Sequence, residues 1–210
     1  MLPPLVLSLN RRRIDRLLRA AYAILTAMSE GIALPSLTSL DIRRGELLPE
    51  SNRLERLDVA LPQILAAVDG ETDPIVIQAT LSALLWETLP QTSWVGFYRR
   101  VAAQTLAVGP YQGPMGCLRI DFRRGVCGAC ARNNETQLVP DVRVFPDHIA
   151  CDDATLSELV LPVRDGDGRV QAVLDLDARM LSGFSQAEAT RLETLLSQAF
   201  PKSVLWPTWD

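Results

Sequence analysis

The chain has 210 residues, of which 48% are hydrophobic and 22% charged, and a formal net charge of -4. This composition supports one buried core plus an extension and argues against intrinsic disorder. An acidic chain lacks the concentrated basic surface that nucleic acids require, so we expect no nucleic-acid partner. No run of about 18 apolar residues is free of charge, so we expect no membrane span.

The cysteine count and the N-terminus indicate the compartment. Four cysteines are too few for a disulfide-stapled secreted scaffold. The first charges follow the apolar stretch of the N-terminus, whereas a secretory signal carries its charges before that stretch. We therefore expect a cytoplasmic protein in a reducing environment, where thiols stay free.

Residues 1–53 are expected to form an N-terminal extension of unclear role. Arg11 to Met28 has the spacing of an amphipathic helix. This leaves two interpretations open: a targeting or membrane-surface helix, or a loosely packed extension, with Met28 as an alternative start. Residues 29–53 contain scattered glycines and prolines and are typical of a linker.

A compact domain is expected over residues 54–200, followed by a tail at 201–210. Its first helix ends at Gly70, and its second begins after Asp73 and stops at Pro90. The final helix begins at a capping box made by Ser185 and Glu188. The patterns predict strands at 93–100, 104–108, 136–139, 158–163 and 169–177, with a short helix at 125–132.

This order of elements predicts an α+β domain, with a central antiparallel sheet and helices packed on one side. The last two strands form a hairpin, because residues 165–168 read DGDG. A long irregular insert covers roughly residues 110–157. Because long loops on a rigid sheet often carry functional residues, we expect the active site in this insert.

All four cysteines and the one histidine lie inside that insert. One interpretation is a zinc site made by Cys127, Cys130, His148 and Cys151, whose spacing suits metal ligands. The other is thiol redox chemistry, with Cys151 as an accessible nucleophile and a second cysteine as its disulfide partner. A buried cysteine can also be a small apolar residue, which is the simplest interpretation of Cys130.

Acidic residues interrupt the apolar hairpin. Asp175 and Asp177 alternate along one strand and share a face, and Glu158 begins the preceding strand. Carboxylates in an apolar setting are costly unless they have partners. They indicate either a solvated strand end or a receptor for a cation such as an ammonium group or a metal ion. A crowded carboxyl group can also hold a proton and act as an acid.

Residues 54–200 resemble the GAF-domain free methionine-(R)-sulfoxide reductases. Six motifs carry the resemblance, in the same order as in that family: SWVGFY (93–98), GPYQGPMGCLRI (109–120), RGVCG (124–128), VPDVRVFPDHIACD (139–152), SELVLPV (157–163) and AVLDLD (172–177). The resemblance implies an oxidoreductase that converts free L-methionine-(R)-sulfoxide to methionine.

The resemblance also implies roles for the thiols. Cys151 matches the nucleophile that attacks the sulfoxide sulfur and becomes a sulfenic acid. Cys117 matches the resolving cysteine, which forms a disulfide with Cys151 that thioredoxin then reduces. Cys127 matches an auxiliary cysteine. No bound cofactor and no metal are expected, and a homodimer is the default expectation for this fold.

The substrate-binding roles follow in the same way. Glu158, Asp175 and Asp177 match acidic residues that bind the α-amino group of the substrate and polarise or protonate the sulfoxide. Trp94 and Tyr98 match aromatic residues that face the methyl–sulfur end.

Two positions depart from the family pattern. Cys130 stands where a small residue is usual, and Asp147 replaces a glycine. The Asp147 charge is expected to raise the pKa of Cys151, and loss of the glycine is expected to stiffen the loop. Two alternatives to the reductase remain: a GAF module that binds a small ligand or senses redox state without turnover, and a zinc-stabilised domain.

Overall fold

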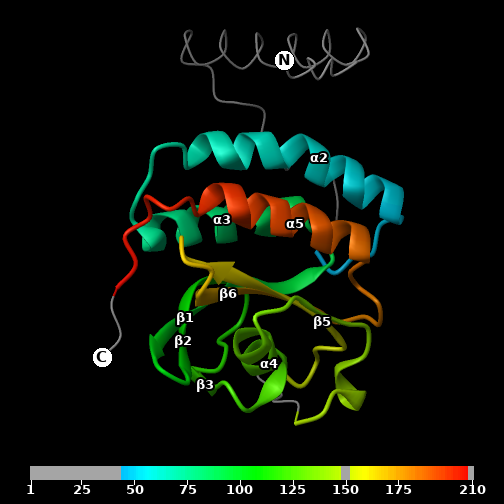
Figure 1. Ribbon diagram of the computed structural model, residues 1–210. Coiled ribbons are helices and arrows are strands. Elements are labelled where there is room, and N and C mark those ends of the chain that lie inside the picture. The colour runs from blue at the N-terminus through cyan, green and yellow to red at the C-terminus, as the bar shows by residue number, and fades with distance from the viewer. Residues whose placement is uncertain (1–43, 148–151, 208–210) are drawn as a thin grey trace, which may run out of the picture. The chain divides into compact units, whose positions relative to one another are not determined.

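The computed structural model describes residues 44–147 and 152–207. At its centre lies a six-stranded sheet with the order β3-β2-β1-β6-β5-β4, in which every neighbouring pair is antiparallel (Figure 1). The strands are β1 (Thr92–Ala102), β2 (Thr105–Gln112), β3 (Arg119–Asp121), β4 (Gln137–Val139), β5 (Ser157–Arg164) and β6 (Val170–Ala178). The expected α+β class is confirmed.

Two layers of helices lie on one face of the sheet. α3 (Pro74–Thr88) packs on β1 and β2, and α5 (Gln186–Ala199) packs on β5. α2 (Glu50–Ala67) lies across α3 and α5 as an outer layer (Figure 1). The opposite face carries the insert, which contains α4 (Gly125–Asn133) and the short 3₁₀ helix η1 (Val142–Val144). The sheet is therefore covered on both faces.

The helix termini follow the expected local chemistry. The Asp73 side chain accepts a hydrogen bond from the Ile75 amide, and Pro74 takes the first helical position of α3, where no donor is needed. Ser185 and Glu188 form both hydrogen bonds of a capping box at the start of α5. α2 begins at Glu50, four residues before the expected start, because Arg53 packs inside the domain against Glu188.

The strands of the insert differ most from expectation. β2 continues to Gln112 through Pro110, although proline usually interrupts a strand. Proline is tolerated here because β3 pairs only with residues 105–107 of β2, so the edge beyond them needs no ladder donor. β3 itself has three residues, which is too short for a periodic pattern to reveal.

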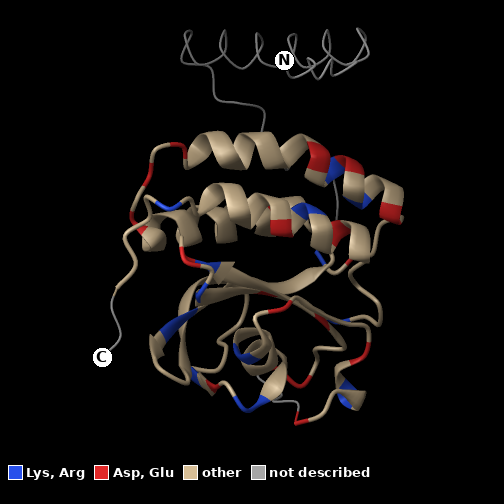
Figure 2. Cartoon of the chain, in the orientation of Figure 1, with Lys and Arg blue, Asp and Glu red and all other residues tan. Residues whose placement is uncertain are grey.

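The charged residues of α2 gather in its N-terminal half, and the C-terminal half is uncharged (Figure 2). Two of them bind α5: Arg53 pairs with Glu188 inside the protein, and Asp58 pairs with Arg191 at the surface. In the part of the chain that the structure describes, no helix combines the length and the apolar character needed to cross a membrane.

Candidate active site

Strand register brings the acidic residues together on the face of the sheet that α4 covers. Asp177 of β6 lies opposite Trp94 of β1 and Glu158 of β5. Asp175 lies opposite Gly96 in the next row. Directly opposed residues of an antiparallel pair point to the same side, so the three carboxyl groups share one face. The shared face expected for Asp175 and Asp177 is confirmed.

Two of these carboxyl groups are deeply buried. Glu158 is 7% exposed and Asp175 is 5% exposed, whereas Asp177 is half-buried. The Cys127 thiol donates to Glu158 Oε1 at 3.9 Å, a long contact of the kind that sulfur makes. Asp175 Oδ1 has no hydrogen-bond partner among the described residues. A buried carboxylate oxygen without a donor is costly, so this atom calls for a ligand.

Burial controls the protonation of the cluster. Loss of hydration raises the pKa of Asp175 to about 7. Burial, together with the nearby Asp175 carboxylate, raises the pKa of Glu158 and of Asp177 well above their ordinary values. At neutral pH the cluster therefore holds protons that isolated carboxyl groups would have lost, and it can supply a proton to a bound molecule.

Aromatic rings form a wall beside the acids. Trp94 stacks on Tyr98 with ring centroids 5.5 Å apart, and on Tyr111 at 5.2 Å. The Trp94 indole donates to the Pro114 carbonyl at 3.1 Å, which holds it against the insert. Burial, reinforced by the Asp175 charge, raises the pKa of Tyr98, so its hydroxyl stays protonated. The wall presents apolar ring surface with a protonated phenol.

Two glycines make this wall sterically feasible. A Cβ on Gly96 would lie 2.2 Å from Cβ of Tyr111, so only glycine leaves room for that residue on the neighbouring strand. A Cβ on Gly116 would lie 2.8 Å from the Tyr98 hydroxyl oxygen. The residues just before Cys117 therefore pass directly over the aromatic rings.

The thiols occupy different environments. Cys127 and Cys130 lie on α4, are free and are buried. Burial raises the pKa of both, most strongly assisted by the Asp175 charge, so both remain thiols. Cys117 is disulfide-bonded and packs against the edge of the apolar cluster beneath α4. Cys127 contacts an acid of the site, whereas Cys130 packs among the residues of the apolar core.

Cys151 and His148 lie outside the described residues, but the residues on both sides of that segment are described. The Asp147 carbonyl accepts a hydrogen bond from the Gly125 amide at the start of α4. Asp152 pairs with Arg179 at 2.7 Å, and its charge contributes to the raised pKa of Asp177. Asp147 therefore lies at the start of α4, and Asp152 lies near the acidic cluster.

The described residues include one arrangement able to hold a cation or a metal ion: side-chain atoms of Cys127, Glu158 and Asp175 all lie within 4.8 Å of one another. This set differs from the zinc ligands that spacing suggested. Two of those four, His148 and Cys151, fall outside the described residues, so that set stays a prediction. Three protonatable acids with one unpartnered oxygen also suit an ammonium group, which brings its own donors.

Sequence reasoning missed two residues of the site. Tyr111 stacks on Trp94 although it comes from the neighbouring strand, and the aromatic residue in the GPYQG motif was its only signal. Arg179 binds Asp152 from the end of β6. No local pattern indicates that contact, because 27 residues separate the two partners.

The chain is similar to known proteins over most of its length. The family model of the GAF domain matches residues 72–199. The chain is 37% identical over 150 residues to the free methionine-R-sulfoxide reductase of Saccharomyces cerevisiae, an alignment that covers 69% of this chain and 83% of that protein. The Escherichia coli enzyme of the same name is 41% identical over 133 residues, covering 63% and 79% of the two chains.

This chain belongs to the free methionine-R-sulfoxide reductase family, built on a GAF domain. A solved structure supports the assignment: that of the Neisseria meningitidis free methionine-R-sulfoxide reductase in complex with its substrate is 38% identical. Its TM-score is 0.67, and the match covers 72% of this chain and 90% of that one. Membership of this family makes the protein an oxidoreductase.

Proposed function

We propose that this protein reduces free L-methionine-(R)-sulfoxide to methionine by thiol chemistry at Cys151. The observation that carries the proposal is the acidic cluster, in which the buried Asp175 has an oxygen without a donor. Free methionine sulfoxide carries an α-ammonium group that a residue inside a peptide lacks. A buried group of carboxyls is a selective receptor for that ammonium, because it provides acceptors where water is excluded.

The chemistry proceeds in two thiol steps. The Cys151 thiolate attacks the sulfoxide sulfur while a proton reaches the sulfoxide oxygen. The oxygen moves to Cys151 as methionine leaves, so the thiol becomes a sulfenic acid and the substrate gains two electrons. The Cys117 thiol then attacks the sulfenic sulfur, which forms a disulfide and releases water. A dithiol protein of the thioredoxin class reduces the disulfide and restores both thiols.

The described residues support distinct roles in this scheme. Glu158 and Asp177, whose pKa values are raised by burial and by their neighbours, are the groups that donate the proton. Trp94 and Tyr98 offer the apolar surface for the methyl–sulfur end. The disulfide at Cys117 is the state that a resolving cysteine takes in the oxidised enzyme. Cys127 remains an auxiliary thiol, donating to Glu158.

The decisive experiment is a coupled assay with thioredoxin, thioredoxin reductase and NADPH. We expect NADPH oxidation with free L-methionine-(R)-sulfoxide, and little with the N-acetyl derivative, which has no ammonium group. No NADPH consumption with the free sulfoxide by well-folded protein would refute the reductase. Binding of the sulfoxide without turnover would favour a sensory module instead.

Two cysteine variants assign the nucleophile. Cys151→Ser should abolish turnover, whereas Cys130→Ser, the matched change at a buried thiol outside the site, should retain it. Substantial activity in Cys151→Ser would contradict the assignment.

One acidic variant tests the substrate receptor. Asp175→Asn should lower kcat/KM by about 10- to 100-fold, as expected for loss of a charge-assisted hydrogen bond worth roughly 1.5–3 kcal/mol. Wild-type kinetics in Asp175→Asn would remove this acid from the site.

A further inference from the structure

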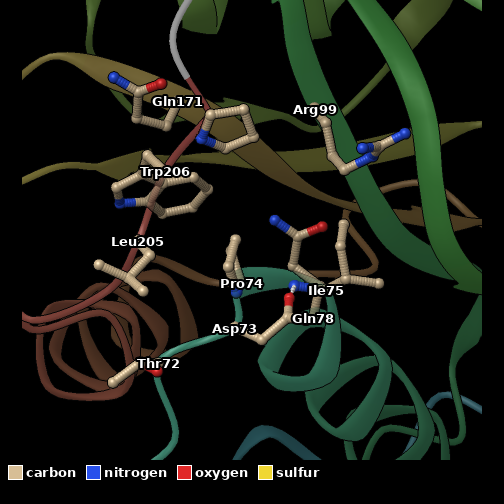
Figure 3. A pocket seen from close by; sticks show the side chains of 10 residues that line it. Thr72, Asp73, Pro74, Ile75, Gln78, Arg99, Gln171, Leu205 and Trp206 are labelled. Carbon is tan, nitrogen blue, oxygen red and sulfur yellow. Dashed lines mark hydrogen bonds between the residues drawn. The ribbon is translucent and has the colours of Figure 1, made fainter.

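A cavity lies on the face of the sheet that α3 covers, among residues that the reductase chemistry does not use. It measures about 280 Å³, and it is bounded by the start of α3, by β1, by β6 and by the C-terminal segment (Figure 3). The lining residues are Thr72, Asp73, Pro74, Ile75, Gln78, Arg99, Gln171, Leu205, Trp206 and Pro207. Its size suits a metabolite no larger than an amino acid, since pockets for drug-sized ligands start at roughly 300 Å³.

The cavity gathers polar groups that lack partners. Seven buried side-chain nitrogen or oxygen atoms have no hydrogen-bond partner among the described residues, and four of them belong to residues that line this cavity: both amide atoms of Gln78, Nε of Arg99 and Nε1 of Trp206. Gln78 is fully buried, and its amide is directed toward the space between Trp206 and Arg99 (Figure 3). Buried amides are almost always hydrogen-bonded, so this concentration marks a place prepared for a polar guest.

The charges around the cavity are of both signs. Arg99 brings a guanidinium group from β1, and Asp73 brings a carboxylate at the start of α3. Only one oxygen of Asp73, Oδ1, accepts the capping hydrogen bond from Ile75. A ligand with one negative and one positive group would satisfy both residues. The Gln78 amide can donate to the negative group of the ligand and accept from its positive group.

Apart from Thr72 and Gln171, the remaining walls are apolar. Pro74, Ile75, Leu205 and the Trp206 ring line the cavity, and Ile75 and Leu205 are also exposed to solvent. The Trp206 ring is fixed by stacking on Phe200 at 5.5 Å. The cavity therefore has polar groups that can bind a zwitterion and, beside them, an apolar wall that can contact a hydrophobic side chain.

We propose that this cavity binds a free α-amino acid with an apolar side chain. Arg99 and the Gln78 nitrogen hold the carboxylate, Asp73 and the Gln78 oxygen hold the ammonium group, and the side chain lies against Trp206 and Leu205. The site is separate from the acidic cluster. Tyr98 and Arg99 are consecutive on β1, so their side chains lie on opposite faces of the sheet. The inference does not rest on the proposed reductase activity.

The test is calorimetric titration of the full chain with L-methionine and L-leucine. Gln78→Leu should weaken binding at this site at least tenfold, and it should fold normally because it removes two unpartnered buried atoms. Gln63→Leu, the same change on α2 outside the cavity, should bind like wild type, and thermal melting of both variants verifies folding. Equal binding by Gln78→Leu and Gln63→Leu, or no binding by wild type at millimolar ligand, would overturn the proposal.

Two further comparisons separate the cavity from the acidic cluster and define the ligand. Asp175→Asn should keep the binding that Gln78→Leu loses, and loss of that same binding in Asp175→Asn would place the ligand in the acidic cluster.

L-Methioninamide lacks the carboxylate and N-acetyl-L-methionine lacks the ammonium group, so each should bind at least tenfold more weakly than L-methionine. Undiminished binding of either analogue would refute recognition of a zwitterion.

Discussion

At the scale of single residues, Asp175 lies in an environment that is costly for a carboxyl group. It sits in the middle of a buried strand, opposite a glycine, with one oxygen unpartnered. Such a residue reduces stability, because a carboxyl group in this environment resists ionisation. Proteins keep strain of this kind where a ligand uses it, which is why we assign Asp175 to the substrate.

This burial predicts how stability depends on pH. The pKa of Asp175 rises from 3.8 to about 7 on folding, so between these values the folded protein holds a proton that the unfolded chain has released. The contribution of Asp175 to stability should therefore fall as pH rises from about 4 to about 7 and stay constant above that. Asp175→Asn cannot ionise, so it should gain up to roughly 4 kcal/mol relative to wild type across this range.

Urea denaturation of both proteins at several pH values measures the difference. A gap that stays constant, or one that narrows as pH rises, would show that Asp175 is not protonated in the folded state.

At the scale of elements, the insert is anchored at positions near the proposed nucleophile. Asp147 adopts a positive φ of 55°, which favours glycine, and its carbonyl accepts a hydrogen bond from α4. On the far side of the segment, Asp152 is tied to β6 through Arg179. The aspartate that departs from the family glycine thus occupies a position where glycine would be unstrained.

Two variants separate the effect of the charge at position 147 from the effect of its backbone conformation. Asp147→Asn tolerates the left-handed conformation and removes only the charge, so it should lower the pKa of Cys151 and leave stability unchanged. Asp147→Gly should lower the same pKa and also relieve backbone strain, for a gain of about 0.5–1 kcal/mol. The rate of Cys151 alkylation as a function of pH reports the thiol, and urea denaturation reports stability. If neither variant shifts the alkylation profile, the Asp147 charge does not act on Cys151.

At the scale of the whole molecule, a buried ion pair fastens the outer helix to the domain. Arg53 of α2 donates two hydrogen bonds of 2.9 Å to the Glu188 carboxylate, which also receives a hydrogen bond from Gln91. Glu188 is completely buried and caps α5 at the same time. The pair therefore unites α2, α5 and the start of β1 in one hydrogen-bonded network.

Arg53→Met should cost roughly 3–5 kcal/mol of unfolding free energy, because it leaves the Glu188 charge buried without its counter-ion. Arg191→Met is the matched control: it breaks the pair between the same two helices at the surface, where such pairs contribute at most about 1 kcal/mol. Urea denaturation gives both values, and hydrogen exchange in α2 shows whether the helix loosens. Similar losses for the two variants would contradict a special role for the buried pair.

Much of this architecture was accessible from local sequence patterns. The caps at Asp73 and Ser185, the hairpin turn at 165–168 and the alternation of Asp175 with Asp177 each depend on neighbours within a few residues. Short-range geometry is dictated by backbone and side-chain chemistry, so such features are visible in the sequence. The acidic cluster and the thiol-bearing insert were identified on the same grounds.

The tertiary structure alone decided the contacts between distant segments. Tyr111 joins the aromatic wall because Gly96 leaves room on the neighbouring strand, and Arg179 reaches Asp152 across 27 residues. Gln78 and Arg99 line the same cavity although they lie on different elements. No local sequence pattern encodes these long-range arrangements, because they depend on strand register and on how helices pack. The sequence by itself thus determined the fold class and predicted the residues of the site, and packing determined the partners, the burial and hence the pKa values of those that the structure describes.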